Sequence, residues 1–483
     1  MGKVVYVSNE KELRDAVMAH GQIPLKNNHN SEDIVGQIYL TNNIGLTEKL
    51  DLPKFTYQHF KGLNIDLCGC TIYDNSVTGL DYLIGRKPID QKEALDVCQS
   101  WSLNLKNGKL LGKQSSGSIL TGTLLDLGAT FNSVVENVQI QNAKNGIVFR
   151  FCLMGHLKNI MSNGIGNDAI YVGIGDWSGA GRNSSQSNHT VVEQCRIFNW
   201  KNSNSAFKVE SSSGIFIKNC ISEGYSPKYH IYWEDTVNTT TVLDRYIESF
   251  HVESPDGGTI YMNIMGGYID MKSVYTQYPL IIEMGAFASP TEINLSRIMW
   301  WPNGSFFKVI GDERNLALRL SDCSSVIDPR NPVQWIGGSA DPITGVLKGI
   351  PRYLSFENKQ NNKFTHNTSI RYNGTLLSPQ APLSVTTTKI PKVLESTKIV
   401  IGGNSGNNDG GAYITHRGMV LRKGTNSASI NTHDIKTIDG SGESAFESTI
   451  TGLLPNTSYT IRAYALNSKG CSYGETVKFT TPL

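Results

Sequence analysis

Val135-Glu136-Asn137-Val138 and Leu157-Lys158-Asn159-Ile160 are two copies of the four-residue phrase that decides the fold. Each copy is an apolar residue, a polar or charged residue, usually a second polar residue, and then an apolar or small residue. The other copies are Leu105-Lys106-Asn107-Gly108, Val192-Glu193-Gln194-Cys195, Ile217-Lys218-Asn219-Cys220, Ile247-Glu248-Ser249-Phe250, Met271-Lys272-Ser273-Val274, Leu295-Ser296-Arg297-Ile298 and Leu320-Ser321-Asp322-Cys323. Their third residues are 107, 137, 159, 194, 219, 249, 273, 297 and 322, so the steps are 30, 22, 35, 25, 30, 24, 24 and 25 residues. Self-similarity with a period of this length predicts a repeat architecture.

A second phrase recurs between the copies of the first. It reads Leu124-Leu125-Asp126-Leu127, Ile147-Val148-Phe149-Arg150, Ala169-Ile170-Tyr171-Val172, Ala206-Phe207-Lys208-Val209, His230-Ile231-Tyr232-Trp233, Thr259-Ile260-Tyr261-Met262, Leu280-Ile281-Ile282-Glu283 and Phe306-Phe307-Lys308-Val309. Each repeat therefore has at least two strand-like stretches, separated by Gly, Asn and Ser turns that are too short for crossover helices. A chain that coils and lays each strand on that of the previous turn satisfies this pattern. The sequence thus predicts a parallel β-helix with coils about 4.8 Å apart.

Residues 4 to 350 resemble the right-handed parallel β-helix of the pectate-lyase superfamily and of phage tailspikes and fibres. In that superfamily the chain opens with a strand and a short helix over the open end of the first coil. Val4-Val5-Tyr6-Val7 matches the strand, and Asn9 and Glu12 have the spacing of a capping box at the start of the helix. Leu13, Ala16 and Val17 are expected to face the first coil, which would otherwise expose apolar surface.

The C-terminal part of the chain has a different character. The repeat phrase fades after about residue 350, and residues 356–395, rich in Asn, Thr, Ser and Pro, are predicted to be a linker. Gly452-Leu453-Leu454-Pro455-Asn456-Thr457-Ser458-Tyr459 resembles the fibronectin type III signature, in which the hydroxyl of the tyrosine ties back to its corner. Asn467-Ser468-Lys469-Gly470 is similar to such modules in gut Bacteroidetes and their crAss-like phages. We therefore expect an all-β chain with a β-helix at 1–355 and a β-sandwich at 396–483.

Composition excludes several classes of partner. The net charge is +2 with no basic run, so nucleic-acid binding is not expected. No stretch of about 18 apolar residues exists, so no membrane insertion is expected. Cys195, Cys220 and Cys323 take equivalent positions in the repeat and are expected to be core residues, while Cys68 and Cys70 lack a second pair with ligand spacing. We expect no metal and no cofactor.

Candidate site residues follow from alternation along the second phrase. If Ile170, Phe207, Ile231 and Ile260 point inward, then Tyr171, Lys208, Tyr232 and Tyr261 form an outward ladder, with Gly173, Glu210, Glu234 and Asn263 in a second ladder beside it. Tyrosines beside carboxylates suit a sugar-binding groove. Glu210 and Glu234 on adjacent coils are the candidate catalytic pair, because carboxyl groups roughly 5 to 9.5 Å apart serve glycosidases. The alternative is that both glutamates are plain surface residues.

Two neighbouring stretches extend this site. Residues 173–182 contain Asp176, Trp177 and Arg182 and are predicted to form a protruding loop, either a wall of a groove or a subunit contact. The stretch from Tyr229 to Asp235 is dense in aromatic and charged residues. The predicted carbohydrate-binding residues are Tyr171, Asp176, Trp177, Tyr229, Tyr232 and Tyr261.

Three classes of function fit these observations. The first is a surface appendage of a phage virion, a tail fibre, tailspike or head fibre, assembled in the host cytoplasm as a homotrimer. Its partners would be a tail or capsid adaptor and a host surface polysaccharide. The second is a polysaccharide-degrading glycosidase or lyase, and the third is a carbohydrate-binding adhesin of the bacterial surface. The opening residues lack the apolar core of a secretory signal. Free cysteines in the core are typical of proteins that fold in a reducing compartment. Both observations favour the virion appendage.

Overall fold

The computed structural model describes residues 3–21, 35–53, 62–97, 101–180, 185–200, 202–225, 227–236, 243–254, 257–278, 280–284, 291–300, short segments between 307 and 382, and 385–406, 414–442, 444–467 and 469–483. The chain divides into two compact units, one of residues 1–311 with 321–333 and one of residues 312–320 with 334–483. It is an all-β protein, with a right-handed parallel β-helix followed by a small β-sandwich, as the sequence predicts.

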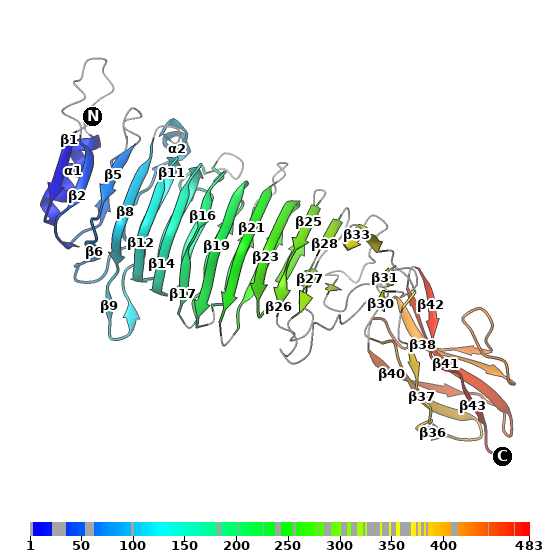
Figure 1. The fold of residues 1–483 in the computed structure, drawn as a ribbon. Coiled ribbons are helices and arrows are strands. Elements are labelled where there is room, and N and C mark those ends of the chain that lie inside the picture. The colour runs from blue at the N-terminus through cyan, green and yellow to red at the C-terminus, as the bar shows by residue number, and fades with distance from the viewer. Residues whose placement is uncertain are drawn as a thin grey trace. The chain divides into compact units, whose positions relative to one another are not determined.

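The β-helix is built from two long sheets, whose strands lie side by side in Figure 1. The first, sheet A, contains β1 (Lys3–Val7), β2 (Val35–Leu40), β3 (Ile44–Leu46), β5 (Leu63–Asp66), β6 (Thr71–Asp74), β8 (Leu103–Leu111), β12 (Val134–Ala143), β14 (His156–Ile165), β16 (Val191–Glu193), β17 (Arg196–Asn199), β19 (Ile215–Gly224), β21 (Asp244–Glu253), β23 (Gly267–Thr276), β25 (Thr291–Ser296), β26 (Met299–Trp300), β28 (Leu316–Ser321), β29 (Ser324–Ser325), β33 (Ser369–Tyr372) and β34 (Thr375–Leu377). The second, sheet B, contains β4 (Leu50–Asp51), β7 (Tyr82–Arg86), β11 (Thr123–Phe131), β13 (Asn145–Leu153), β15 (Asp168–Gly173), β18 (Ser205–Glu210), β20 (Tyr229–Glu234), β22 (Thr259–Ile264), β24 (Leu280–Met284), β27 (Phe307–Ile310) and β32 (Leu354–Glu357).

The repeat phrase is the bend within each strand of sheet A. Its first and fourth residues are both buried, as Val135 and Val138 or Leu157 and Ile160 are. Two buried residues three positions apart do not fit a straight strand, in which every second side chain faces the same side. The third residue resolves this by adopting a left-handed conformation, with φ values of 61° at Asn107, 58° at Asn137 and 52° at Asn159. Gln194, Asn219, Ser249, Ser273 and Arg297 repeat it on the later coils.

Side-chain amides stack at this bend. The Asn137 side chain donates to Asn107 Oδ1 at 3.0 Å, and the Asn159 side chain donates to Asn137 Oδ1 at 2.8 Å. Asn107 in turn donates to the Asp66 carboxylate at 3.1 and 3.2 Å. Asparagine is among the few residues that adopt left-handed backbone angles readily, and here it also links one coil to the next.

The second residue of the phrase forms a ladder of alternating charge. In-register pairing places Asp66, Lys106, Glu136, Lys158, Glu193, Lys218, Glu248 and Lys272 in one outward column. Ion pairs join these residues two by two, with N–O distances of 3.6 Å for Lys106–Asp66, 3.2 Å for Lys158–Glu136, 2.9 Å for Lys218–Glu193 and 3.3 Å for Lys272–Glu248. Like charges at a spacing of about 4.8 Å would repel, so the alternation turns a cost of parallel stacking into an attraction.

The N-terminal cap has the predicted form. Helix α1 (Glu10–Gly21) buries Leu13, Ala16 and Val17, and the Glu12 amide donates to Asn9 Oδ1 at 3.0 Å. The Glu12 carboxylate accepts from the amide and hydroxyl of Ser8, one residue before the expected partner, at 2.7 and 2.9 Å.

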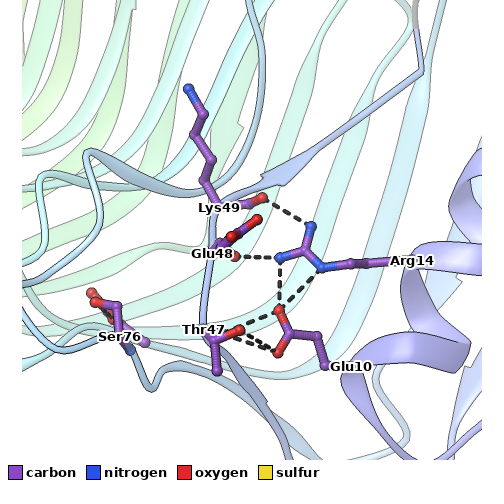
Figure 2. A network of polar contacts seen from close by, with 7 residues as sticks. Glu10, Arg14, Thr47, Glu48, Lys49 and Ser76 are labelled. Atoms are coloured by element: carbon purple, nitrogen blue, oxygen red, sulfur yellow. Dashed lines mark hydrogen bonds and ion pairs between the residues drawn. The ribbon is translucent and has the colours of Figure 1, made fainter.

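A polar network fixes this helix to the loop at residues 47–49, as Figure 2 shows. Arg14 pairs with Glu10 at 2.7 Å and donates to the carbonyls of Lys49 and Glu48. The amide and hydroxyl of Thr47 donate to the Glu10 carboxylate at 3.1 and 2.9 Å. The cap is therefore held by a buried apolar face and by the polar network of Glu10, Arg14 and Thr47 at its first turn.

Two further details of the coil differ from or extend the expectations. A second helix, α2 (Gln91–Val97), lies between β7 and β8, although no helix was expected within the coils, and its Ala94 packs on Ala129 and Phe151. A short hairpin joins β9 (Gln114–Ser115) to β10 (Ser118–Ile119). Cys195 and Cys220 are buried core residues, as expected, whereas Cys323 lies outside the described residues.

The second unit contains two antiparallel sheets. One is formed by β35 (Thr386–Thr387), β36 (Val393–Leu394), β37 (Lys398–Asn404) and β40 (Ala445–Thr451), and the other by β38 (His416–Lys423), β39 (Ile435–Lys436), β41 (Ser458–Asn467), β42 (Gly470–Tyr473) and β43 (Val477–Thr480). Ile399, Ile401, Met419, Leu421 and Ile461 belong to the core between them. The Leu454 amide donates to the Tyr459 hydroxyl at 3.0 Å, so this tyrosine ties back to its own corner.

The predicted linker contains strands. β33 pairs with β28 in sheet A, and β35 and β36 pair with β37 in one of the antiparallel sheets. A small antiparallel pair, β30 (Ser339–Ala340) and β31 (Leu347–Lys348), precedes this region.

Candidate functional site

The outward ladders predicted for the second phrase exist on sheet B. Tyr171, Lys208, Tyr232 and Tyr261 follow one another in register on β15, β18, β20 and β22. Glu210, Glu234 and Asn263 form the neighbouring column on the last three of these strands. Both columns are half-buried, while the residues between them, such as Val209 and Trp233, are in the core. Simple alternation along each strand thus places the predicted residues on one face.

Tyrosine hydroxyls hold the carboxylates of this face. Tyr171 donates to Glu210 on the next coil, and Tyr261 donates to Glu283 in the same way. The Glu234 carboxylate lies near the Tyr232 hydroxyl on the same strand. Glu210 also accepts from the Thr236 hydroxyl at 2.9 Å. Burial and the nearby carboxylate raise the pKa of Tyr171 and Tyr232, so both phenols stay protonated and keep donating.

The tyrosine rings of β20 and β22 stack on each other. Ring centroids are 4.6 Å apart for Tyr229–Tyr232 and 5.8 Å apart for Tyr232–Tyr261, with interplanar angles of 16° and 17°. The ring of Tyr171 lies under two cations, with Lys208 Nζ at 4.6 Å and the Arg150 guanidinium at 5.4 Å from its centroid. The tyrosine ring faces that were expected to stack on sugar rings are therefore largely covered by other side chains. The ladder exposes the ring edges and the hydroxyl groups.

A cluster of charges continues the ladder toward the N-terminus and was missed from the sequence. Asp126 is buried and pairs with Arg150, while Lys87 Nζ lies 3.4 Å from its second oxygen. Burial raises the pKa of Asp126, and the two cations oppose that effect. The two predicted columns lead to both residues when they are extended toward the N-terminus. Asp126 pairs in register with Val148, which pairs with Tyr171, so Asp126 lies two coils before Tyr171 in the first column. Arg150 pairs with Gly173, so it lies one coil before Gly173 in the second column.

The residues of the predicted loop separate in the structure. Asp176 joins the charged cluster, with its carboxylate 3.3 Å from both Arg150 Nε and Lys87 Nζ and a side chain 42% exposed. Trp177 turns the other way: it is only 9% exposed, packs against Phe151, and donates from Nε1 to Gln91 Oε1 of α2 at 2.9 Å. The expectation that Trp177 offers a flat face to a sugar is corrected, because an indole this apolar is more stable beneath the helix. Arg182 lies outside the described residues.

One pair of side chains has the spacing of a base and a hydroxyl nucleophile. His230 Nδ1 lies 2.8 Å from Ser222 Oγ, and His230 Nε2 lies 3.1 Å from the Gly257 carbonyl oxygen. Both side chains are fully buried, and burial lowers the pKa of His230 to about 4. A substrate has no access to this pair, so its role is to fill the core.

Among the described residues, no group of three or more His, Cys, Asp or Glu side chains has the arrangement of a metal site. Within the same residues, no helix has both the length and the apolar character needed to cross a bilayer.

Comparisons with known proteins give a fold likeness and no family. No protein-family model matches the sequence, and no curated protein matches it.

Several solved structures are similar in fold. The Dettilon tailspike protein is 10% identical with a TM-score of 0.34, the match covering 95% of this chain and 93% of that one. The A-module of the mannuronan C-5 epimerase AlgE6 of Azotobacter vinelandii is 9% identical with a TM-score of 0.35, over 71% of this chain and 91% of that one. PfbA, a surface adhesin of Streptococcus pneumoniae, is 11% identical with a TM-score of 0.29, over 81% of this chain and 92% of that one. A function for this chain must therefore be argued from its own side chains.

Proposed function

We propose that this protein is a surface appendage of a phage virion, a tail fibre, tailspike or head fibre, that attaches the particle to a host surface glycan. Its long outward faces, rather than a buried pocket, would make the contact. In this proposal the chain assembles as a homotrimer in the host cytoplasm and binds a tail or capsid adaptor. A phage of gut Bacteroidetes, of the crAss-like kind, is the proposed source.

The state of the two candidate catalytic carboxylates is the observation that favours attachment over cleavage. The two oxygens of Glu210 accept from the hydroxyls of Tyr171 and Thr236. Burial and the nearby Glu234 carboxylate raise the pKa of Tyr232, so Glu234 lies beside a phenol that stays protonated. A glycosidase needs one carboxyl free to protonate the leaving oxygen and one free to attack or to activate water. Glu210, whose two oxygens both accept hydrogen bonds from neighbouring side chains, is poorly placed for either catalytic role.

Free thiols support assembly in a reducing compartment. Cys152, Cys195 and Cys220 are buried without a disulfide, and burial raises the pKa of Cys152 to about 12, which keeps it an unreactive thiol. Proteins that fold in oxidising compartments rarely leave several cysteines unpaired.

The second unit is proposed to be a fibronectin type III-like module. Its strands divide between the two sheets in the order expected of that sandwich, with β37 and β40 in one sheet and β38 and β41 in the other. The bond from the Leu454 amide to the Tyr459 hydroxyl corresponds to the tyrosine corner of such domains. The proposed division of the chain remains 1–355, 356–395 and 396–483.

Binding to cells and the mass in solution test this function together. Fluorescently labelled full-length protein should bind encapsulated Bacteroidetes cells, and periodate oxidation of the cell-surface glycans should abolish the binding. Light scattering should give three times the chain mass of 53.1 kDa. Binding that survives periodate would contradict glycan attachment. Depolymerisation of purified capsule that is lost in both Glu210→Gln and Glu234→Gln would instead establish the polysaccharide-degrading enzyme.

A further inference from the structure

An open groove lies on the outer face of sheet A, away from the tyrosine ladder. Its volume is about 260 Å³, and side chains from β12, β14, β17 and β19 line it. These strands belong to four successive coils, which together span about 14 Å along the axis at the usual strand spacing. A length of about 14 Å would accommodate a short segment of a longer oligosaccharide.

The register of the coils builds the groove from two adjacent columns. Gln139, Met161 and Arg196 follow one another in the first column. Gln141, Asn163, Phe198 and Glu223 follow one another in the second column. Both columns come after the left-handed bend, so they lie on a different stretch of the surface from the alternating charge ladder.

The lining combines free amides with exposed apolar surface. Among the described residues, the side chains of Gln139 and Asn163 make no hydrogen bond, which leaves two amide groups, each with two N–H donors and a carbonyl acceptor, open to a ligand. Met161 is 46% exposed and Phe198 is 38% exposed. The Phe198 ring rests on Gly224, since a Cβ added there would come within 3.0 Å of the ring. Glycine at position 224, with a φ of 87°, leaves room for the Phe198 ring.

The groove carries almost no net charge. Arg196 donates twice to the Glu223 carboxylate, from Nε at 2.6 Å and from Nη2 at 3.0 Å, so the one cation and the one anion of the lining neutralise each other. The charge ladder on the same strands has a lysine or a glutamate on every coil. An anionic ligand would find no unpaired cation in this lining.

We propose that this groove binds a short neutral segment of an oligosaccharide, with Phe198 and Met161 under the sugar rings and Gln139 and Asn163 on their hydroxyls. This assignment rests on the proposed attachment to glycans and gives it a location. Sheet B is the less suitable face, because its tyrosine rings stack on each other and its carboxylates are already bound. In the groove on sheet A, Phe198 and Met161 are exposed, and the side-chain amides of Gln139 and Asn163 make no hydrogen bond within the described residues.

The experiment compares groove variants with matched outward residues elsewhere on the coil. The groove variants are Phe198→Ala and the double variant Gln139→Ala/Asn163→Ala. Tyr275→Ala serves as the control, because Tyr275 lies in the same column as Met161 but beyond the groove on β23. Tyr232→Phe tests the ladder on sheet B. The probes are whole encapsulated Bacteroidetes cells that bind the wild type, and short acid-hydrolysis fragments of their purified capsule observed by saturation-transfer NMR.

We expect Phe198→Ala to weaken binding by at least about ten-fold, equivalent to about 1.4 kcal/mol, and the amide double variant to do the same. Tyr275→Ala and Tyr232→Phe should bind like the wild type. If Tyr232→Phe loses binding while the groove variants keep it, attachment to glycans stands and the groove assignment is overturned. A Phe198→Ala protein whose oligomeric mass changes would show a subunit contact and also overturn it. If no wild-type binding to glycan exists, the proposed function fails and the groove assignment fails with it.

Discussion

Asparagine recurs at the bend of sheet A because two demands meet at one residue. The backbone there is left-handed, a conformation that costs most L-residues about 1–2 kcal/mol and asparagine less. The side chain is also in a position to bond its equivalents one coil below and one coil above, as Asn137 does with Asn107 and Asn159. Glycine would meet only the first demand, and alanine would meet neither.

Substitutions at Asn137 can separate the two demands. Asn137→Gly keeps the left-handed angle and loses both amide bonds, whereas Asn137→Ala adds the conformational strain. We expect the free energy of local opening of β12 and β14 to fall by about 1 kcal/mol more in the alanine variant than in the glycine variant. Native-state hydrogen exchange on these two strands measures it, and equal losses in both variants would show that the backbone angle at residue 137 is not the main cost.

At the scale of the element, much of the coil could be predicted from the sequence, whereas the bend was not predicted although its signal was present. The alternation along the second phrase is a straight strand with a period of two, so it gave the outward columns of Tyr171, Tyr232 and Tyr261 in their true register. The first phrase also had its signal, since apolar residues three positions apart, such as Val135 and Val138, do not fit one straight strand. Ring stacking and the burial of Trp177 depend on which neighbours surround a side chain, and no local pattern encodes that.

The N-terminal helix is the element whose stability should depend on pH. Burial raises the pKa of Glu10, but hydrogen bonds from Arg14 and Thr47 outweigh it, so the folded pKa lies below the ordinary 4.5. A lowered pKa contributes stability above the unfolded value that is lost as pH falls through the folded value. Hydrogen-exchange protection of α1, corrected for the intrinsic rate, should therefore decline below about pH 4.5.

Two variants make this prediction specific to the polar network of Glu10, Arg14 and Thr47. Glu10→Gln should weaken protection of α1 at neutral pH and flatten its dependence on acid. Glu48→Gln should behave like the wild type, because Glu48 contributes its backbone carbonyl to Arg14. An unchanged pH profile in Glu10→Gln would assign the effect to another group.

At the scale of the whole molecule, two separate cores hold the chain. The coils bury stacked apolar side chains such as Leu157 and Ile160, and the second unit has its own core around Ile399 and Ile461. Tryptophan distinguishes the two experimentally, since six of the seven tryptophans lie within residues 1–311 and one, Trp335, lies in the second unit. Tryptophan fluorescence therefore reports chiefly on the β-helix, and far-UV circular dichroism reports on both units.

Tyr459→Phe should destabilise the second unit alone. The substitution removes the acceptor of the Leu454 amide in a half-buried corner, and an unsatisfied buried amide costs about 1–3 kcal/mol. Denaturant unfolding followed by circular dichroism should show an earlier phase for the second unit. The tryptophan fluorescence transition should not move, and a shift in it would mean that the two cores unfold as one.

The ladder of opposite charges also sets a rule for how this protein can grow or shrink. Removing the coil that contains Lys158 would set Glu136 against Glu193, and duplicating it would set lysine against lysine. Removing two successive coils leaves every sign matched, because the charge alternates from one coil to the next. An insertion or deletion of two coils therefore preserves the ion pairs of the ladder, whereas a change of one coil brings two like charges together.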